Sequence, residues 1–537
     1  MQRLKSIIYP FVNHPLLAIV SIVLLTLKLT WNGWDNWDLS LADGALLFKS
    51  GQTVAQSGAL PGVSGSPFFA VYYGIFHALF DDPMWIYALH RIVMVVLTWV
   101  LLFILLRMIF PQWVAWGVGM YAVAISQNLN NDFVVHAFLV IPILLTYISL
   151  VWIQQRGMLW DALAWGVALL VGLSRPEMAL APLLLIGASV AWRAWQGQLR
   201  LNRSTLWYAL SVALIGALGI IILLGTFTES DRSFVAFSQH FAWGYGERTE
   251  WAGNHFGGEQ AAIVEAFGEG VRSVGDALRA NPSAFMAHLA WNIRLFILEF
   301  PNITMPTPPI TWIYRPILLG MGLALVVVIV GRTWRNHPNP FLHVSKLWLG
   351  AGWFILPTLL ASLVIRPRLI YLLPLQPLLL LLASVILYYA FPIRWERALT
   401  FVMLPLSVGV WLGYPSPYGQ DVGRIVIDAV RAMEAIPDFD QPYGVVANEA
   451  FAYCLYQPRP HCVPYGVEDL PPYEAHYPEE WIKQQNVQII LIDADFLNKL
   501  DEDLRGYYAT LAADPSRFGW MKFADAGLID VYTPIQP

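Results

Sequence analysis

Long apolar runs recur along the first 413 residues of this 537-residue chain. A run of about 17–25 mostly apolar residues is long enough to cross the hydrocarbon core of a bilayer as a helix. Eleven segments approach this description, at 13–30, 84–109, 112–128, 133–153, 158–174, 177–194, 206–227, 311–331, 346–365, 369–390 and 396–413. The pattern predicts an α-helical polytopic membrane protein with about 11 transmembrane helices.

The composition supports this class. Hydrophobic residues make up 57% of the chain and charged residues 13%, with a mean hydropathy of +0.53, whereas roughly a quarter of residues are charged in soluble domains. The 24 tryptophans and 23 tyrosines suit a membrane protein because their rings collect at the headgroup level. The net charge of -5 gives no indication of a nucleic-acid partner.

Lys and Arg residues fall in alternate loops, as the positive-inside rule requires. We take 13–30 as a retained span and not a signal peptide, and we place the N-terminus in the cytoplasm. This orientation puts one set of Lys and Arg residues on the cytoplasmic side: Arg3, Lys5, Arg107, Arg156, Arg193, Arg200, Arg203, Arg332, Arg335, Lys346, Arg394 and Arg397. The odd number of spans then places the C-terminal region outside, with two long connections at about 31–83 and 228–310. The predicted location is the cell membrane.

The two outer connections carry further helical patterns. In the first, 38–50 has helical spacing and is expected to stop at Gly51, and 66–81 has Pro67 in its first turn. Both are expected to lie on the outer membrane surface. The second begins with a polar loop from Ser238, continues as an amphipathic helix at about 259–279, and restarts at Asn281 as an interfacial helix ending near Phe300. Loops of such length are usually functional.

The texture changes near Tyr414, where charge and proline content rise. Strands are predicted at 443–447 and 487–492 and near 529–532, and helices near 421–436, 478–485 and 494–513. The chain is therefore expected to comprise a transmembrane module at 1–413 and a small extracytoplasmic α/β domain at 414–537. The two cysteines, Cys454 and Cys462, are too few for a thiolate metal site but could form a disulfide outside the cell.

Two carboxylates, Asp35 and Asp38, directly follow the first apolar run in the stretch WNGWDNWD. Flanked by Trp34 and Trp37 at a membrane edge, either carboxylate could have a raised pKa and act as a general base. Equally, Asp38 could be the N-cap of the helix that follows, since Asp is a favoured capping residue. The residues alone leave both interpretations open.

Arg175 and Glu177 occupy a very short outer turn between two apolar spans. The forked donors of Arg suit a phosphate group. The alternative is an Arg–Glu pair that satisfies itself within the turn.

Arg366 and Arg368 also lie on the predicted outer side, where they break the positive-inside pattern. Such exceptions indicate that an anionic group offsets the charge. The alternative is that these side chains extend to the lipid headgroups.

A polar group in the second outer connection comprises His240, Glu247, Glu250, His255 and Glu259, followed by Asn292 and Arg294. Imidazole and carboxylate groups together can bind a divalent metal, but the spacing matches no closed site, which favours ordinary surface residues. His77, His90, His136 and His288 lie in apolar helical surroundings, which favours a packing role. No P-loop, dinucleotide-binding, HExxH or nucleophile-elbow motif is present.

Together these features resemble the GT-C superfamily of integral-membrane glycosyltransferases, which includes protein O-mannosyltransferases and aminoarabinose lipid A transferases. The resemblance rests on the acidic residues after the first span, two interfacial helices in the first outer loop, the aromatic segment at 65–69, the RPE turn at 175–177, the RPRLIYLLP run at 366–374 and a small outer C-terminal domain. It covers nearly the whole chain in layout, although each motif is short.

The resemblance implies transfer of a sugar from a polyprenyl-phosphate-linked donor to a lipid, glycan or protein acceptor at the outer face. It implies that Asp35 or Asp38 is the base and that Arg175, Arg366 and Arg368 bind the donor phosphate, with Glu177, His255 and Asn292 as supporting residues. Family members often have adjacent acids, whereas these two are three positions apart, so the resemblance does not choose between them. No cofactor is required by this chemistry, although some relatives use a divalent metal.

Two other classes compete with this interpretation. A transporter or lipid flippase also needs charge in the membrane, but the sequence has no inverted repeat and little charge at mid-span, where transport sites usually lie. A catalytically inactive scaffold would use the C-terminal domain to bind a partner. Replacing Asp35 and Asp38 by Asn separates a transferase from a scaffold, because only the transferase loses turnover.

Overall fold

A computed structural model describes most of the chain. The described residues are 10, 12–30, 42–62, 65–123, 134–154, 156–199, 202–228, 232–251, 253, 258–303, 345–391, 395–413, 425–437, 441–457, 461–471 and 477–535. They divide into two compact units. The first unit comprises Met1–Lys28, Pro61–Phe69 and Met94–Tyr414, and the second comprises Leu29–Leu60, Ala70–Val93 and Pro415–Pro537.

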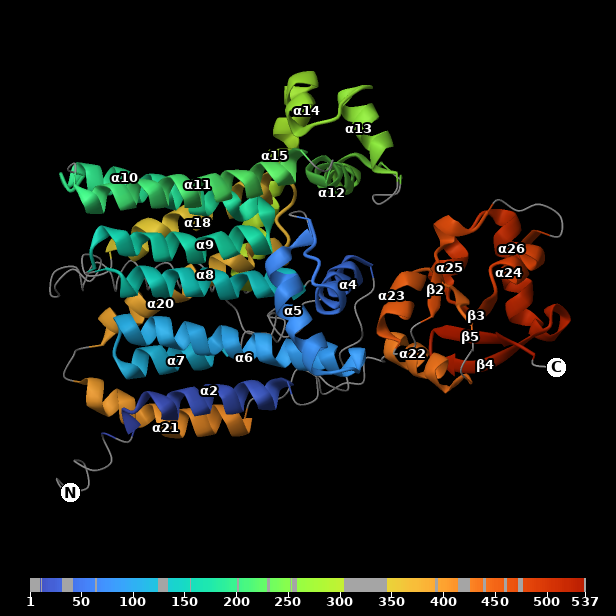
Figure 1. Cartoon of the computed structure of the whole chain (residues 1–537), viewed down its shortest axis with the longest axis horizontal. Helices are drawn as coiled ribbons and strands as arrows, with labels where there is room; N and C mark the ends of the chain where they lie inside the picture. Colours follow the sequence, from blue (N-terminus) through green and yellow to red (C-terminus); the bar gives the residue numbers. More distant parts are fainter. Residues whose placement is uncertain are drawn as a thin grey trace. The chain divides into compact units, whose positions relative to one another are not determined.

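The first unit is helical, and helices α8, α9, α11 and α18 run alongside one another in it (Figure 1). Its helices are α2 (Pro15–Thr30), α7 (Gln112–Val123), α8 (Val134–Trp152), α9 (Asp161–Ser174), α10 (Leu180–Trp195), α11 (Arg203–Thr228), α12 (Arg232–Thr249), α13 (Glu259–Phe267), α14 (Val274–Ala280), α15 (Pro282–Glu299), α18 (Ser345–Val364), α19 (Leu369–Leu372), α20 (Gln376–Ala390) and α21 (Glu396–Gly413). Short 3₁₀ turns join several of them: η3 (Met158–Trp160), η4 (Pro176–Ala179), η5 (Phe300–Ile303) and η6 (Leu373–Leu375). Helices α5 (Pro67–Leu79) and α6 (Pro83–Ile109) belong partly to each unit.

Within the described ranges, six helical segments are long and apolar enough to cross a membrane. They are Pro83–Ile109, Val135–Trp152, Glu177–Trp195, Arg203–Gly225, Ser345–Val364 and Ile370–Tyr389. The predicted span 311–331 lies outside the described residues, and each of the other predicted spans is largely helical over its described residues. The expectation of a largely helical membrane protein is therefore confirmed, whereas the full count of 11 spans stays a prediction.

Two helices are found in the first long connection, as predicted, but Gly51 does not end the first of them. Helix α4 runs from Ala42 to Ser57, through Gly51. A Cβ atom at Gly51 would lie 2.7 Å from the Tyr73 ring on α5. Gly51 therefore allows close contact between the two helices, and the prediction of a helix stop was wrong.

The second long connection is more helical than predicted. Residues 232–249, expected to be a polar loop from Ser238, form helix α12. The helix predicted at 259–279 is instead two helices, α13 and α14, because Gly268 and Gly270 between them adopt positive φ angles of 90° and 83°. The restart at Asn281 is confirmed: its side chain accepts a hydrogen bond from the Ala284 backbone N–H and caps α15.

The C-terminal part of the second unit is an α/β structure around a mixed five-stranded sheet with strand order β2-β1-β3-β5-β4. The strands are β1 (Tyr443–Val446), β2 (Cys462–Tyr465), β3 (Val487–Ile492), β4 (Trp520–Ala526) and β5 (Ile529–Pro534). Strands β2, β1 and β3 pair in parallel, whereas β3–β5 and β5–β4 are antiparallel. Strands β2 and β4 were not predicted; β2 has only four residues, including a proline.

The helices of this region are α22 (Ile425–Ala435), α23 (Ala450–Tyr456), α24 (Tyr477–Gln484), α25 (Ala494–Lys499) and α26 (Glu502–Ala513). The helix predicted at 494–513 is divided because Asp501 starts a new helix, with its carboxylate accepting from the Leu504 N–H. Helix α23 was not predicted. A disulfide joins Cys454 on α23 to Cys462 on β2, with 5.4 Å between their Cα atoms.

Replacing Gly51 by Ala should destabilise the protein, because the new methyl group would overlap the Tyr73 ring. We expect a loss of about 1–3 kcal/mol, typical of overpacking. Gly506→Ala is the matched control, since Gly506 lies in helix α26 with no atom within 4 Å of a Cβ, and it should stabilise by up to ~1 kcal/mol. Thermal unfolding of the purified protein in detergent measures both, and equal effects would contradict the close contact.

Candidate functional site

The segment Arg366-Pro367-Arg368 joins α18 to α19 in the first unit. Proline has no backbone N–H and disfavours helical geometry in the residue before it. Helix α18 accordingly ends at Val364, and Arg368 has the extended geometry φ -90°, ψ 148° before α19 begins. The sequence thus places two arginines directly after a helix of span length.

Two side chains of α15 satisfy the carbonyl groups at the end of α18, which lack partners within a helix. The Asn292 amide donates to the carbonyl oxygens of Leu363 and Ile365 at 2.7 and 3.2 Å. The Nε2 atom of His288 donates to the Val364 carbonyl at 3.0 Å. Both side chains are completely buried. Asn292, predicted as a supporting residue, therefore holds the backbone that leads to Arg366.

Arg366 forms a two-point ion pair with Glu247 of α12. Its Nη1 and Nη2 atoms donate to the two carboxylate oxygens at 3.0 and 2.8 Å. The guanidinium lies 4.2 Å from the centre of the Trp243 ring, and only 8% of Arg366 is exposed. Glu247 also accepts a hydrogen bond from the Trp291 indole N–H at 3.0 Å. The pair therefore joins α12, α15 and the end of α18.

Arg368 lies on the same indole, with its guanidinium 5.6 Å from the Trp243 ring centre. His240 stacks against Trp243 with an interplanar angle of 19°, and its Nε2 atom is 3.2 Å from the Tyr371 hydroxyl oxygen. We refer to this set as the Arg366 cluster; it comprises His240, Trp243, Glu247, Arg366, Arg368 and Tyr371. It contains two arginines and one carboxylate.

The histidine of the cluster is held in its neutral form. Burial, followed by the nearby charges of Arg368 and Arg366, lowers the pKa of His240 to about 4. Burial likewise lowers the pKa of His288 to about 4. At neutral pH the cluster therefore contains two cationic guanidinium groups and one carboxylate, and the forked donors of guanidinium groups suit an anionic ligand.

Arg175 and Glu177 form an ion pair with each other. Arg175 ends α9 in an extended conformation, and the 3₁₀ turn η4 that follows contains Glu177. This turn packs on α18, because the Thr358 hydroxyl donates to the Met178 sulfur at 3.8 Å. The alternative interpretation, a pair satisfied within its own turn, is what the structure shows. Arg175 and Arg366 are thus matched to different carboxylates.

The other predicted site residues lie outside the described part of the chain. These are Asp35, Asp38 and His255, and their roles stay predictions. Among the residues that the structure does describe, no group of three His, Cys, Asp or Glu side chains could hold a metal ion.

The sequence interpretation missed the partners of the arginines. Glu247 and His240 were treated as surface residues of a loop, and Trp243 was not singled out. Positions 240, 243 and 247 have the i, i+3, i+7 spacing of one helix face. That periodicity was the signal that could have found them, and it has meaning only once residues 232–249 are recognised as a helix.

No protein-family model and no curated protein sequence matches the chain. Solved structures do match. Oligosaccharyltransferase AglB from Archaeoglobus fulgidus, in complex with an inhibitory peptide and a dolichol-phosphate, is 14% identical, with a TM-score of 0.46 over 89% of this chain and 69% of its own. ArnT from Cupriavidus metallidurans is 14% identical, with a TM-score of 0.39 over 96% and 97% of the two chains.

Arabinosyltransferase EmbB from Mycobacterium smegmatis is also 14% identical, with a TM-score of 0.29 over 74% of this chain and 42% of its own. At this identity these structures assign no role to any residue of the chain.

The lowered pKa values of His240 and His288 predict that acid destabilises the protein. Because the unfolded chain takes up protons near pH 6.5 and these folded histidines only near pH 4, stability should fall as pH drops through this window, by at most about 1.4 kcal/mol per pH unit for each group. Thermal unfolding at pH 7.5, 6 and 5 measures the slope. His240→Gln should reduce it, with exposed His461→Gln as the substitution control; an unchanged slope in His240→Gln would contradict the prediction.

Proposed function

We propose that this protein is a membrane glycosyltransferase that moves a sugar from a polyprenyl-phosphate-linked donor to an acceptor at the outer face of the cell membrane. The observation that carries the proposal is the Arg366 cluster, in which two arginines lie on the Trp243 indole and one of them pairs with the Glu247 carboxylate, directly after a span-length helix. A cationic site in this position suits a phosphate group attached to a lipid. The acceptor can be a lipid, a glycan or a protein.

In the proposed complex, the donor phosphate takes the place of the Glu247 carboxylate on Arg366. The present ion pair shows that the two donor atoms of Arg366 lie in the plane that a bidentate anion requires, with N–O distances of 2.8 and 3.0 Å. Arg368, whose guanidinium lies 5.6 Å from the centre of the Trp243 ring, supplies a second positive charge. Arg175 stays a proposed third ligand, available to the phosphate only if it leaves Glu177.

The reaction we propose is a displacement at the anomeric carbon of the sugar. The acceptor oxygen or nitrogen forms a bond to that carbon, and the bond from the carbon to the phosphate oxygen breaks, leaving its electron pair on the phosphate. Asp35 or Asp38 takes the acceptor proton as general base. The arginines stabilise the charge that develops on the leaving phosphate. This scheme assigns no step to a metal; His255 and Asn292 are supporting residues in it.

Replacing the candidate bases tests the reaction. Asp35→Asn, Asp38→Asn and the double variant should retain binding of polyprenyl phosphate, while the variant that lacks the base should lose transfer by about 10²- to 10⁴-fold, the usual contribution of general-base catalysis. The measurement is incubation of the purified protein with a panel of radiolabelled polyprenyl-phosphate sugars and a membrane extract as acceptor.

Other outcomes point to other functions. If no sugar is transferred or hydrolysed across the panel and no donor binds, the transferase proposal fails. If both single variants and the double variant keep full cellular function, the protein is a scaffold. If donor lipid moves across a liposome bilayer without sugar transfer, the protein is a transporter.

Glu247→Gln tests whether the phosphate replaces this carboxylate. Removing the competing charge should tighten binding of polyprenyl phosphate roughly three- to tenfold, while the unliganded protein becomes less stable because Arg366 loses its ionic partner. Glu250→Gln, an exposed carboxylate one turn further along, is the control and should leave affinity unchanged. Scintillation proximity binding with labelled polyprenyl phosphate gives the affinities of both variants. Weaker binding in Glu247→Gln would contradict displacement.

A further inference from the structure

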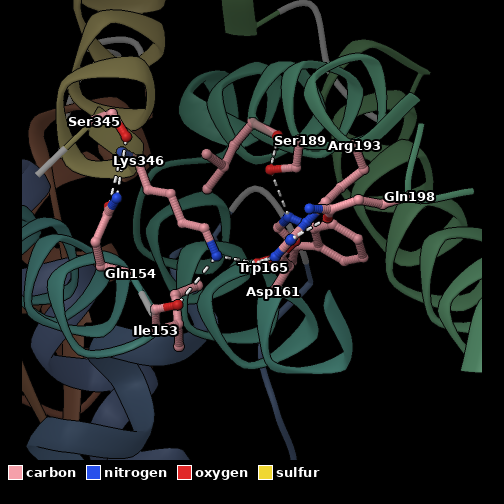
Figure 2. Close-up of polar contacts among 10 residues, drawn as sticks. Ile153, Gln154, Asp161, Trp165, Ser189, Arg193, Gln198, Ser345 and Lys346 are labelled. Carbon is pink, nitrogen blue, oxygen red and sulfur yellow. Dashed lines mark hydrogen bonds and ion pairs between the residues drawn. The ribbon is translucent and has the colours of Figure 1, made fainter. Parts of the chain in front are cut away.

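A second ionic cluster lies at the start of α18, the opposite end of the helix from Arg366. Figure 2 shows its side chains. The Asp161 carboxylate, at the start of α9, accepts from Arg193 Nε and Nη2 at 3.0 and 3.2 Å. It also accepts from Lys346 Nζ at 3.0 Å. The exposed fractions of the Asp161, Arg193 and Lys346 side chains are 5%, 8% and 14%. We refer to these three residues as the Asp161 cluster.

Neutral groups complete the contacts of this cluster but add no negative charge. Arg193 Nη1 donates to the Gln198 side chain at 2.5 Å, and Lys346 Nζ donates to the Ile153 carbonyl at 3.1 Å. Gln154 accepts from the Lys346 backbone N–H at 2.9 Å and donates to the Ser345 hydroxyl at 3.0 Å. The cluster therefore joins α8, α9, α10 and α18 and carries one positive charge in excess.

The sequence provides no second carboxylate to neutralise that charge. In residues 83–228 and 304–391, which contain the helices that the structure describes around the cluster, the acidic residues are Asp132, Asp161 and Glu177. Glu177 follows the far end of α9, whose 14 residues span about 21 Å. Asp132 precedes α8, whereas the cluster follows the other end of that helix. A buried charge without a counter-ion is strongly unfavourable, so an anion from outside the chain is expected.

A small cavity of about 20 Å³ opens beside the two cations. Arg193, Lys346 and Asp161 form its polar wall, and the rest is mainly apolar, with Leu150, Trp165, Leu185 and Trp192. Lys and Arg carry three and five N–H donors respectively, so the contacts above leave donors on both cations for a further acceptor. The cavity combines a cationic wall with an apolar one.

We infer that the two cations at this small cavity bind the phosphate group of an anionic phospholipid, with only the start of its acyl chains near the apolar wall. The surroundings place the cavity at headgroup level: Arg156 stacks on Trp152 and Trp160 at 3.7 and 5.0 Å from their ring centres, and Trp195 is 80% exposed. Such a belt of tryptophan and arginine is typical of the membrane–water interface. The apolar wall favours a lipid over free phosphate. The inference does not depend on the proposed transferase activity.

Lys346→Met tests the site, because it removes the excess charge while the Asp161–Arg193 pair stays neutral, so the variant should fold. Native mass spectrometry of the detergent-purified protein, titrated with phosphatidylglycerol or phosphatidylcholine, measures lipid retention. We expect wild type to retain phosphatidylglycerol at least tenfold better than phosphatidylcholine, and Lys346→Met to lose that preference. Arg203→Met, which removes an exposed cation at the start of α11, is the control and should keep it.

A thermal-unfolding measurement accompanies the titration. Phosphatidylglycerol should raise the unfolding temperature of wild type and of Arg203→Met but not of Lys346→Met, whereas inorganic phosphate at the same concentration should have little effect. Three results would overturn the inference: equal retention of both lipids by wild type, an equal loss in both variants, which indicates general surface charge, or full stabilisation by inorganic phosphate, which indicates a site for the free ion.

Discussion

The ion pair between Arg366 and Glu247 is the interaction on which the arrangement of the candidate site depends. Arg366 is 8% exposed, and a buried guanidinium without a partner would cost several kcal/mol. An anionic partner removes this cost, and here that partner is Glu247, carried by α12, more than 100 positions earlier in the chain. The indole of Trp291 then binds the same carboxylate from α15, so three helices converge on one charge.

The capping of α18 has the same physical origin. Its last carbonyl groups face a buried environment in which unpaired polar atoms are costly. Asn292 and His288 pair with them from α15, which fixes the point at which the backbone leaves the helix toward Arg366. The hydrogen bonds to the backbone at the end of α18 and the ion pair to the Arg366 side chain therefore both fix the position of Arg366.

Apolar runs predicted the helices well, because a helix that crosses a membrane or is buried needs an apolar run whatever its neighbours are. Interruptions were harder to predict. Gly51 was interpreted as a stop although it lies within α4 against Tyr73, and Gly268 and Gly270, which do end a helix, were passed over. The difference lies in the tertiary contacts, because glycine permits close contact between helices at one position and a positive φ angle at another.

For the candidate site, the sequence identified the arginines, because they break a charge rule that depends only on topology. It did not identify Glu247, Trp243 or His240, because their importance depends on which helix packs against which. A polar segment between spans is normally a loop, and the high share of polar residues in 232–249 hid a helix whose one face meets Arg366. Long-range pairing of this kind leaves little local signal in a single sequence.

The two ionic clusters share one design at the two ends of α18. Each contains two cations and one carboxylate: Arg366, Arg368 and Glu247 at one end, and Lys346, Arg193 and Asp161 at the other. Helix α18 has 20 residues, so the clusters are about 30 Å apart, which matches the ~30 Å hydrocarbon thickness of a bilayer. In the proposed arrangement, with α18 spanning the bilayer, each cluster offers its cations to a phosphate-bearing amphiphile on its own side. Two unit charges about 30 Å apart interact by only about 0.6 kcal/mol at an effective dielectric constant of about 20, so each site binds its ligand nearly independently of the other.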